Sequence, residues 1–133
     1  MEDSVTDSTP TITKVSEDER GEIYAINLPG NRELMLLHSL KGTLRGGHSH
    51  TCDENVLLLT GRLRYFNKSP NTGREWQFEM TEGQTAYNPA GLIHLGEFLE
   101  SSWLIEWKIG VTKEGWTNEN HAPYRDKVTA QLH

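Results

Sequence analysis

Three histidines and one glutamate occur in a pattern that can bind a metal ion. His48 and His50 are separated by one residue, Glu54 follows shortly after them, and His94 comes later, behind a Pro-x-Gly turn at 89–91. Alternate residues of a β-strand point to the same face, so His48 and His50 can direct two imidazole rings at one ion, and Glu54 keeps that parity. The turn would direct the strand that carries His94 back toward the same place. The pattern predicts one divalent transition metal per chain, and these ligand types suit Fe, Mn, Ni, Zn, Cu or Co.

An ion held this way keeps one or two coordination positions open if it prefers five or six ligands. It can then polarise a carbonyl, stabilise an enolate, deliver a hydroxide or activate dioxygen. Iron or manganese would favour oxygen chemistry on a small chelating substrate, whereas zinc or nickel would favour lyase, isomerase or hydrolytic chemistry. The four side chains alone do not choose between these reactions.

Short strands must position these side chains, because most of the chain consists of short alternating or apolar segments separated by Pro-Gly, Gly-Gly, Thr-Gly and Asn-Pro turns. No segment shows a long apolar stripe with a period of 3.6 residues. The pattern predicts an all-β domain, a barrel or jelly roll. We expect one short helix near 126–131 and eight strands, at 23–28, 33–40, 55–60, 63–66, 76–80, 85–88, 94–98 and 103–109.

The chain has 133 residues, which is enough for one domain with a sizeable core and too few for two domains of typical size. Residues 1–13 are rich in Ser, Thr and Asp and carry no apolar period, so we expect a flexible leader there. The barrel is expected at 14–110. Residues 111–133 lack strand alternation and are expected to form a tail that packs on the barrel.

The charge balance argues against polyanionic partners. Thirteen Lys and Arg against nineteen Asp and Glu give a formal net charge of −6, which repels nucleic acid and anionic lipid surfaces. No apolar run approaches the roughly 20 residues of a membrane-spanning helix. The acidic N-terminus does not resemble a secretory signal, and a single cysteine, Cys52, needs no oxidising compartment. These features predict a cytoplasmic protein that binds neither nucleic acid nor membranes.

Two spaced motifs surround the metal pattern. The first consists of Gly42, His48, His50, Glu54 and Gly61. The second consists of Gly83, Pro89, Gly91, His94 and Phe98. Together they resemble the two motifs of the cupin superfamily, with every fixed position filled except the last. There Phe98 replaces the family's Asn, which is not a metal ligand.

The resemblance implies a single β-barrel of the jelly-roll type, with the metal held inside by His48, His50, Glu54 and His94. As the carboxylate in this set, Glu54 is also the expected catalytic residue. The resemblance further implies a small-molecule substrate and a homodimer, and exposed edge strands give a physical motive for dimerisation.

Residues near the motifs are candidates for contact with a substrate. Arg45 can bind a carboxylate or phosphate with two parallel hydrogen bonds, although a surface ion pair is an equal alternative. Tyr65, Trp76 and Trp107 are candidates for the cavity wall, with core packing as the alternative. Three further candidates have side chains whose direction the sequence does not fix: Tyr24, Tyr87 and Glu106. Cys52 shares parity with His50 and can either approach the metal or fill space, while His38, His121 and His133 are expected at the surface.

The function predicted from these observations is a metal-dependent cupin enzyme that acts on a small oxygen-rich molecule. Its reaction would be that of a dioxygenase or other oxidoreductase, or that of a lyase or isomerase. The alternative is a non-catalytic cupin that binds or senses a ligand. The two predict different sites: catalysis predicts a cavity lined by at least one titratable group besides the metal ligands, whereas a pure binder predicts a closed coordination shell or an apolar pocket.

Overall fold

The computed structural model describes residues 9–112 and 114–132, and within them the chain forms strands and a single helix. Eleven strands are present: β1 (Thr11–Asp18), β2 (Gly21–Leu28), β3 (Arg32–Ser39), β4 (Leu44–His50), β5 (Asp53–Thr60), β6 (Arg62–Lys68), β7 (Glu75–Thr81), β8 (Thr85–Asn88), β9 (Ile93–Phe98), β10 (Ser102–Ile109) and β11 (Asn118–Asn120). The helix, α2, spans Ala122–Gln131. No helix among the described residues is long and apolar enough to cross a membrane.

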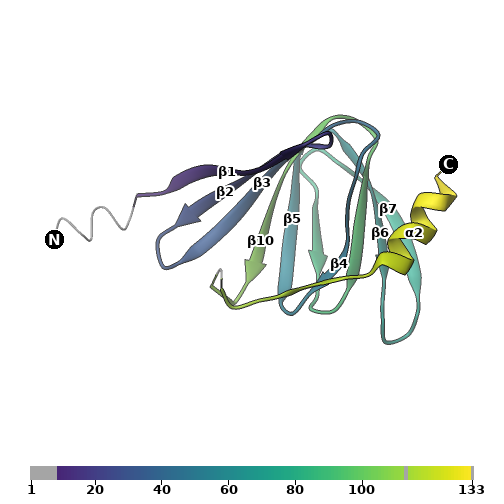
Figure 1. Cartoon of the computed structure of the whole chain (residues 1–133). Helices are drawn as coiled ribbons and strands as arrows, with labels where there is room; N and C mark the ends of the chain where they lie inside the picture. The colour runs from purple at the N-terminus through teal and green to yellow at the C-terminus, as the bar shows by residue number, and fades with distance from the viewer. Residues whose placement is uncertain (1–8, 113, 133) are drawn as a thin grey trace.

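The strands form two antiparallel sheets that pack face to face (Figure 1). The first sheet has the order β1-β2-β3-β10-β5-β8, and the second has the order β11-β4-β9-β6-β7. This arrangement confirms the predicted all-β jelly roll. In the described residues no strand pairing joins one sheet to the other, so the barrel consists of two packed sheets.

The eight predicted strands are confirmed, and three more are present that the sequence pattern did not predict. Strand β1 starts at Thr11, inside the segment 1–13 that was expected as a leader, and its residues are almost all exposed. An exposed edge strand has no buried face and therefore no apolar alternation to detect. Strand β4 is interrupted by a glycine pair, and β11 has three polar residues. Residues 1–8 lie outside the described residues.

The main core lies between the sheets and contains residues of both. It consists of Leu37, Val56, Leu58, Leu63, Tyr65, Met80, Ala86, Phe98 and Leu104. Polar and charged side chains occupy the rest of the inner faces, and they include Arg45, His50, Glu54, Asn67, Asn88 and His94, all of them buried. Because burying polar groups costs free energy unless they find partners, this concentration marks a site.

A second apolar cluster lies on the outer face of the five-stranded sheet. Tyr124 and Val128 of α2 pack there on Phe66, Ile93 and Leu95. The chain reaches this position from β10 by running along one end of the two sheets (Figure 1). The segment 114–132 therefore covers parts of both sheets, including the end at which the histidines lie.

Candidate metal centre and adjoining cavity

The three predicted histidine ligands meet between the sheets. His48 and His50 come from β4, and His94 comes from the neighbouring strand β9, where it lies directly opposite His48. One ligand nitrogen from each ring lies within 4.8 Å of the other two. The ring centroids are 4.7 Å apart for His48 and His50 and 4.9 Å apart for His50 and His94. This is the three-histidine cluster that the spacing predicted.

The predicted fourth ligand, Glu54, comes from β5 in the opposite sheet. Its Oε2 lies 3.3 Å from Nε2 of His50, and its Oε1 lies 3.5 Å from Nε2 of His94. Two atoms that each lie about 2.1 Å from one ion are about 3.0 to 3.4 Å apart, for bond angles between 90° and tetrahedral. The carboxylate is therefore within reach of an ion shared with the histidines.

Unpartnered nitrogens on two of the imidazoles fit a metal ion. His50 Nδ1, His50 Nε2 and His94 Nε2 are buried and make no hydrogen bond, although the Glu54 carboxylate lies 3.3 and 3.5 Å from the two Nε2 atoms. Buried polar atoms in proteins nearly always have a hydrogen-bond partner, and an orphaned group needs an explanation. A divalent transition metal would satisfy these nitrogens, since imidazole is among its preferred ligands.

The protonation of the site also suits a metal. Burial, reinforced by the neighbouring His94 and His50, lowers the pKa of His48 to about 3, and burial lowers the pKa of His94 to about 4. Both rings are therefore neutral at pH 7, the form in which imidazole binds metals. Burial opposes ionisation of Glu54, but contact with His50 and the charge of Lys108 outweigh it and hold its pKa well below the usual range.

A row of polar residues crosses three strands of the six-stranded sheet. Glu54 of β5 lies opposite Asn88 of β8 on one side and opposite Lys108 of β10 on the other. Asn88 donates a hydrogen bond of 3.2 Å to Oε1 of Glu54, and Lys108 donates one of 2.7 Å to Oε2. Asn88 also donates to the hydroxyl of Tyr65 at 2.8 Å. Both carboxylate oxygens of Glu54 are thus fixed in position before any ion binds.

Trp116 covers this part of the site from the segment that follows β10. Its ring lies 4.1 Å below the ammonium of Lys108 and meets the ring of His50 edge-on, with 5.2 Å between centroids. The sequence analysis did not identify Lys108, Asn88 or Trp116. Lys108 could have been predicted from strand alternation. It shares the inner face of its strand with Glu106 and Leu104, two and four residues earlier.

A cavity of about 300 Å³ adjoins the histidines. His48 and His94 line it on the metal side, together with the predicted substrate residues Arg45 and Tyr65. Glu106, whose side-chain direction the sequence did not fix, also lines the cavity. The tail beyond residue 110 contributes two further lining residues that the sequence analysis missed, Asn120 and Arg125.

The charged and phenolic groups of this cavity have shifted pKa values. Burial raises the pKa of Glu106 to about 8, and the charge of Glu54 adds to this effect. Burial likewise raises the pKa of Tyr65 well above its ordinary value. It lowers the pKa of Arg45, although the guanidinium stays protonated. A neutral carboxyl, a neutral phenol and a cation therefore face the cavity at neutral pH.

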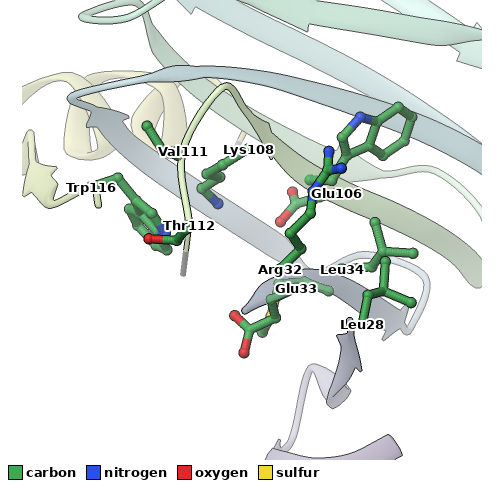
Figure 2. Close-up of a pocket in the computed structure, with 11 residues that line it drawn as sticks. Leu28, Arg32, Glu33, Leu34, Glu106, Lys108, Val111, Thr112 and Trp116 are labelled. Atoms are coloured by element: carbon green, nitrogen blue, oxygen red, sulfur yellow. The ribbon is translucent and has the colours of Figure 1, made fainter. Parts of the chain in front are cut away.

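Two of the predicted substrate residues lie away from this cavity. Trp76 is at the edge of the second sheet on β7, where the guanidinium of Arg74 lies 4.9 Å from its ring. Trp107 lines a separate, smaller pocket of about 50 Å³ together with Leu34, Arg32 and Trp116. Figure 2 shows that smaller pocket, with Trp116 and Lys108 on one side and Leu28 and Leu34 on the other. Glu106 lines both spaces.

The remaining candidates lie outside the cavity. Cys52 is buried in the turn between β4 and β5, and burial raises the pKa of its thiol. Tyr87 is exposed and donates a hydrogen bond to Asp53. His38 contacts Glu22, and His121 contacts Ser49. Tyr24 stacks on Trp103, while His133 lies outside the described residues.

Comparison with known proteins identifies the fold. No protein-family model matches the chain, and no curated protein sequence matches it. Among solved structures, the capsular polysaccharide assembling protein CapF from Staphylococcus aureus matches with a TM-score of 0.65 and 21% identity, covering 80% of this chain and 31% of that one. Oxalate decarboxylase from Bacillus subtilis matches with a TM-score of 0.63 and 22% identity, covering 79% of this chain and 29% of that one. A 7S globulin from Momordica charantia matches with a TM-score of 0.66 and 17% identity, covering 80% and 34%.

This chain spans about a third of the length of each of these structures. Identities of this size show the fold and not the activity. The two-sheet architecture, the three-histidine cluster inside it and these structural matches agree with the resemblance that the two motifs carry. The chain has the cupin fold, and three histidines gather in its interior.

Proposed function

We propose that the chain is a metal-dependent cupin enzyme that acts on a small oxygen-rich molecule. The observation that carries the proposal is the set of buried, unpartnered imidazole nitrogens on His50 and His94, next to the neutral ring of His48. One divalent transition metal per chain would be held by His48, His50, His94 and Glu54. When bound, it would supply Lewis acidity and open positions for substrate oxygen atoms.

The protein's own residues have separate tasks in this proposal. Glu54 supplies the single negative charge of the ligand set, and Asn88 and Lys108 hold its oxygens. Trp116 excludes water from the side of His50. The carboxyl of Glu106 carries a proton at neutral pH and can donate it to a substrate oxygen, because its pKa of about 8 lies close to the working range.

Catalysis is favoured over ligand binding alone by the groups that line the cavity. A pure binder needs no titratable side chain beside the metal ligands, yet Glu106 and Tyr65 both face the cavity of this protein. Perturbed pKa values of this kind concentrate at functional sites. The reaction is either an oxidation or a lyase or isomerase step. Manganese is the first metal to test, since a matching oxalate decarboxylase from Bacillus subtilis contains Mn(II) centres.

Elemental analysis of the purified protein tests the metal site. We expect about one ion per chain in the wild type and almost none in a variant that combines His48→Ala with His94→Ala. A His38→Ala variant is the matched control, because His38 contacts Glu22 away from the cavity. A wild-type protein that takes up none of the candidate ions after incubation would contradict the proposal. Iron or manganese in the protein leads to oxygen-consumption assays, and zinc or nickel to lyase and isomerase assays.

The homodimer remains part of the proposal, with the outer face of the six-stranded sheet as the contact surface. Ile105 and Trp107 alternate with the inward-facing Leu104 and Glu106, Ile105 lies opposite Leu57 of β5, and Leu59 on the same strand is 40% exposed. An apolar outer face of this kind is common at interfaces between copies. Sedimentation equilibrium should show a dimer that Ile105→Lys converts to a monomer, and a wild-type monomer would overturn this part of the proposal. The cytoplasmic location remains a prediction from the sequence.

A further inference from the structure

Arg45 is a buried cation without a carboxylate partner. The residue is only 9% exposed. Its Nε donates a hydrogen bond of 2.5 Å to the hydroxyl of Ser39, and its Nη2 donates one of 3.4 Å to the carbonyl of His38. Among residues 9–112 and 114–132, no carboxylate lies within ion-pair distance of its guanidinium. A buried charge of this kind is costly unless an opposite charge compensates it.

Arg125 brings a second guanidinium to the same cavity from α2. Its Nη1 donates a hydrogen bond of 2.8 Å to the carbonyl of Gly46. Its aliphatic stem lies against Gly47, where an added Cβ would stand only 2.9 Å from Cβ of Arg125. The missing side chain at Gly47 thus lets Arg125 reach the cavity wall. In the described part of the chain, Arg125 also has no ion pair.

The other charges at the cavity do not neutralise these two. Arg20 lines the cavity as well, but it is already paired with Asp18, whose Oδ2 accepts hydrogen bonds of 2.7 and 3.1 Å. Glu106 is the one acidic residue among those that line the cavity, and burial keeps it mostly protonated at neutral pH. Three arginines and one acidic residue therefore line the cavity, and Asp18 and Glu22 act on Arg45 from nearby without pairing with it.

We propose that Arg45 and Arg125 bind the anionic group, a carboxylate or a phosphate, of the small molecule on which the metal site acts. Guanidinium groups recognise both kinds of anion through charge-assisted hydrogen bonds. This inference rests on the proposed function, because it defines the substrate class of the same site.

The positions of Arg45 and His48 along β4 set the length of such a ligand. Arg45 lies opposite Gly96 of β9 and His48 lies opposite His94, so the two residues are separated by two positions of β9, or about 7 Å along a strand. A ligand that reaches both ends therefore has an oxygen-bearing end at the histidines and an anionic end at the two arginines. Small organic acids and their phosphorylated relatives have this form.

Isothermal titration calorimetry of the purified protein with three probes tests the inference. The probes are succinate, phosphoglycolate and the uncharged control 1,4-butanediol. We expect both anions to bind and the diol not to bind. Arg45→Gln and Arg125→Gln should each weaken anion binding about tenfold or more. Arg74→Gln, which removes an exposed arginine on the far hairpin, should change it less than about twofold.

Arg125 is half-buried, so Arg125→Gln keeps the test decisive if Arg45→Gln fails to fold. Tighter binding of succinate identifies a carboxylate site, and tighter binding of phosphoglycolate a phosphate site. Anion affinities that stay the same in both cavity variants, or a diol that binds as tightly as the anions, would overturn the inference. Metal content is measured on the same samples. Arginine-dependent anion binding by a protein that holds no metal would refute the proposed function and leave the anion site standing.

Discussion

The ammonium of Lys108 lies 2.7 Å from Oε2 of Glu54, directly across the pairing of β10 with β5. Both side chains are largely withdrawn from solvent, with 11% and 1% of their surface exposed. The carboxylate that we assign to the metal is therefore already paired with a cation in the protein itself. We expect Lys108 to stabilise the metal-free fold and to compete with a metal for the same oxygen.

This competition predicts opposite effects of a Lys108→Met substitution on stability and on metal binding. Removing one partner of a buried ion pair lowers the free energy of unfolding by about 3 to 5 kcal/mol. Urea denaturation in the presence of EDTA should show a decrease of that order. Metal affinity, measured by competition with a chelator, should rise about tenfold or more, because a positive charge next to the ion is removed. Lys127→Met breaks the exposed pair with Glu75 and should cost less than about 1 kcal/mol. A Lys108→Met protein with weaker metal binding would show that Lys108 supports the metal site instead of competing with it.

Metal removal should lower the melting temperature. A ligand that binds only the folded protein stabilises it by about 2.7 kcal/mol at a concentration 100 times its Kd, which corresponds to about 10 °C for a domain of this size. Differential scanning calorimetry of the EDTA-treated protein with and without added Mn²⁺ measures the shift. The variant that combines His48→Ala with His94→Ala should show none. An equal shift in that variant would place the ion elsewhere.

Glu106 makes the stability of the metal-free protein depend on pH. Its pKa in the folded protein, about 8, lies above the ordinary value of 4.5, so the folded state holds a proton that the unfolded state releases. The corresponding stability is fully present below pH 4.5 and is lost as the pH rises through 8. Relative to Glu106→Gln, the wild type should lose up to about 1.4 kcal/mol per pH unit in that window. Urea midpoints at pH 5 to 9 in EDTA measure this, with the exposed Glu119→Gln as control, and parallel curves for wild type and Glu106→Gln would contradict it.

Gly46 and Gly47 lie side by side in β4, and adding one methyl group at Gly46 should strongly lower the free energy of unfolding. Gly46 has a φ of 103°, and an added Cβ would lie 2.7 Å from the carbonyl oxygen of His94. Strain and steric overlap together should make Gly46→Ala cost about 3 kcal/mol or more. Gly73 has a φ of 74° with open space around it, so Gly73→Ala should cost only about 1 kcal/mol. Equal losses for the two variants in urea denaturation would show that β4 and β9 can move apart at little cost.

The sequence predicted the three-histidine cluster because its signal is local. His48, His50 and Glu54 lie within seven residues, and the turn before His94 is equally compact. Lys108 and Arg125 carry no such signal, because each is an ordinary surface-type residue until the fold brings it to the site. Arg45 was predicted as a substrate contact, but its lack of a counter-ion depends on where every nearby carboxylate lies. Trp76 and Trp107 were misjudged for a related reason, since aromatic type and strand alternation do not reveal which face of a strand meets the cavity.

Both sheets contribute to the proposed metal site, so the site depends on how the two sheets come together during folding. The histidines come from neighbouring strands of one sheet, while Glu54 and its two partners come from three strands of the other. The segment 48–54 carries three of the four proposed ligands, but His94 joins them only through the pairing of β4 with β9, so we expect the complete ligand set to form late in folding. Pairings between distant segments form slowly, and here they must be complete before the site exists. Added metal should therefore leave the refolding rate unchanged and lower the unfolding rate, because the ion stabilises only the completed fold.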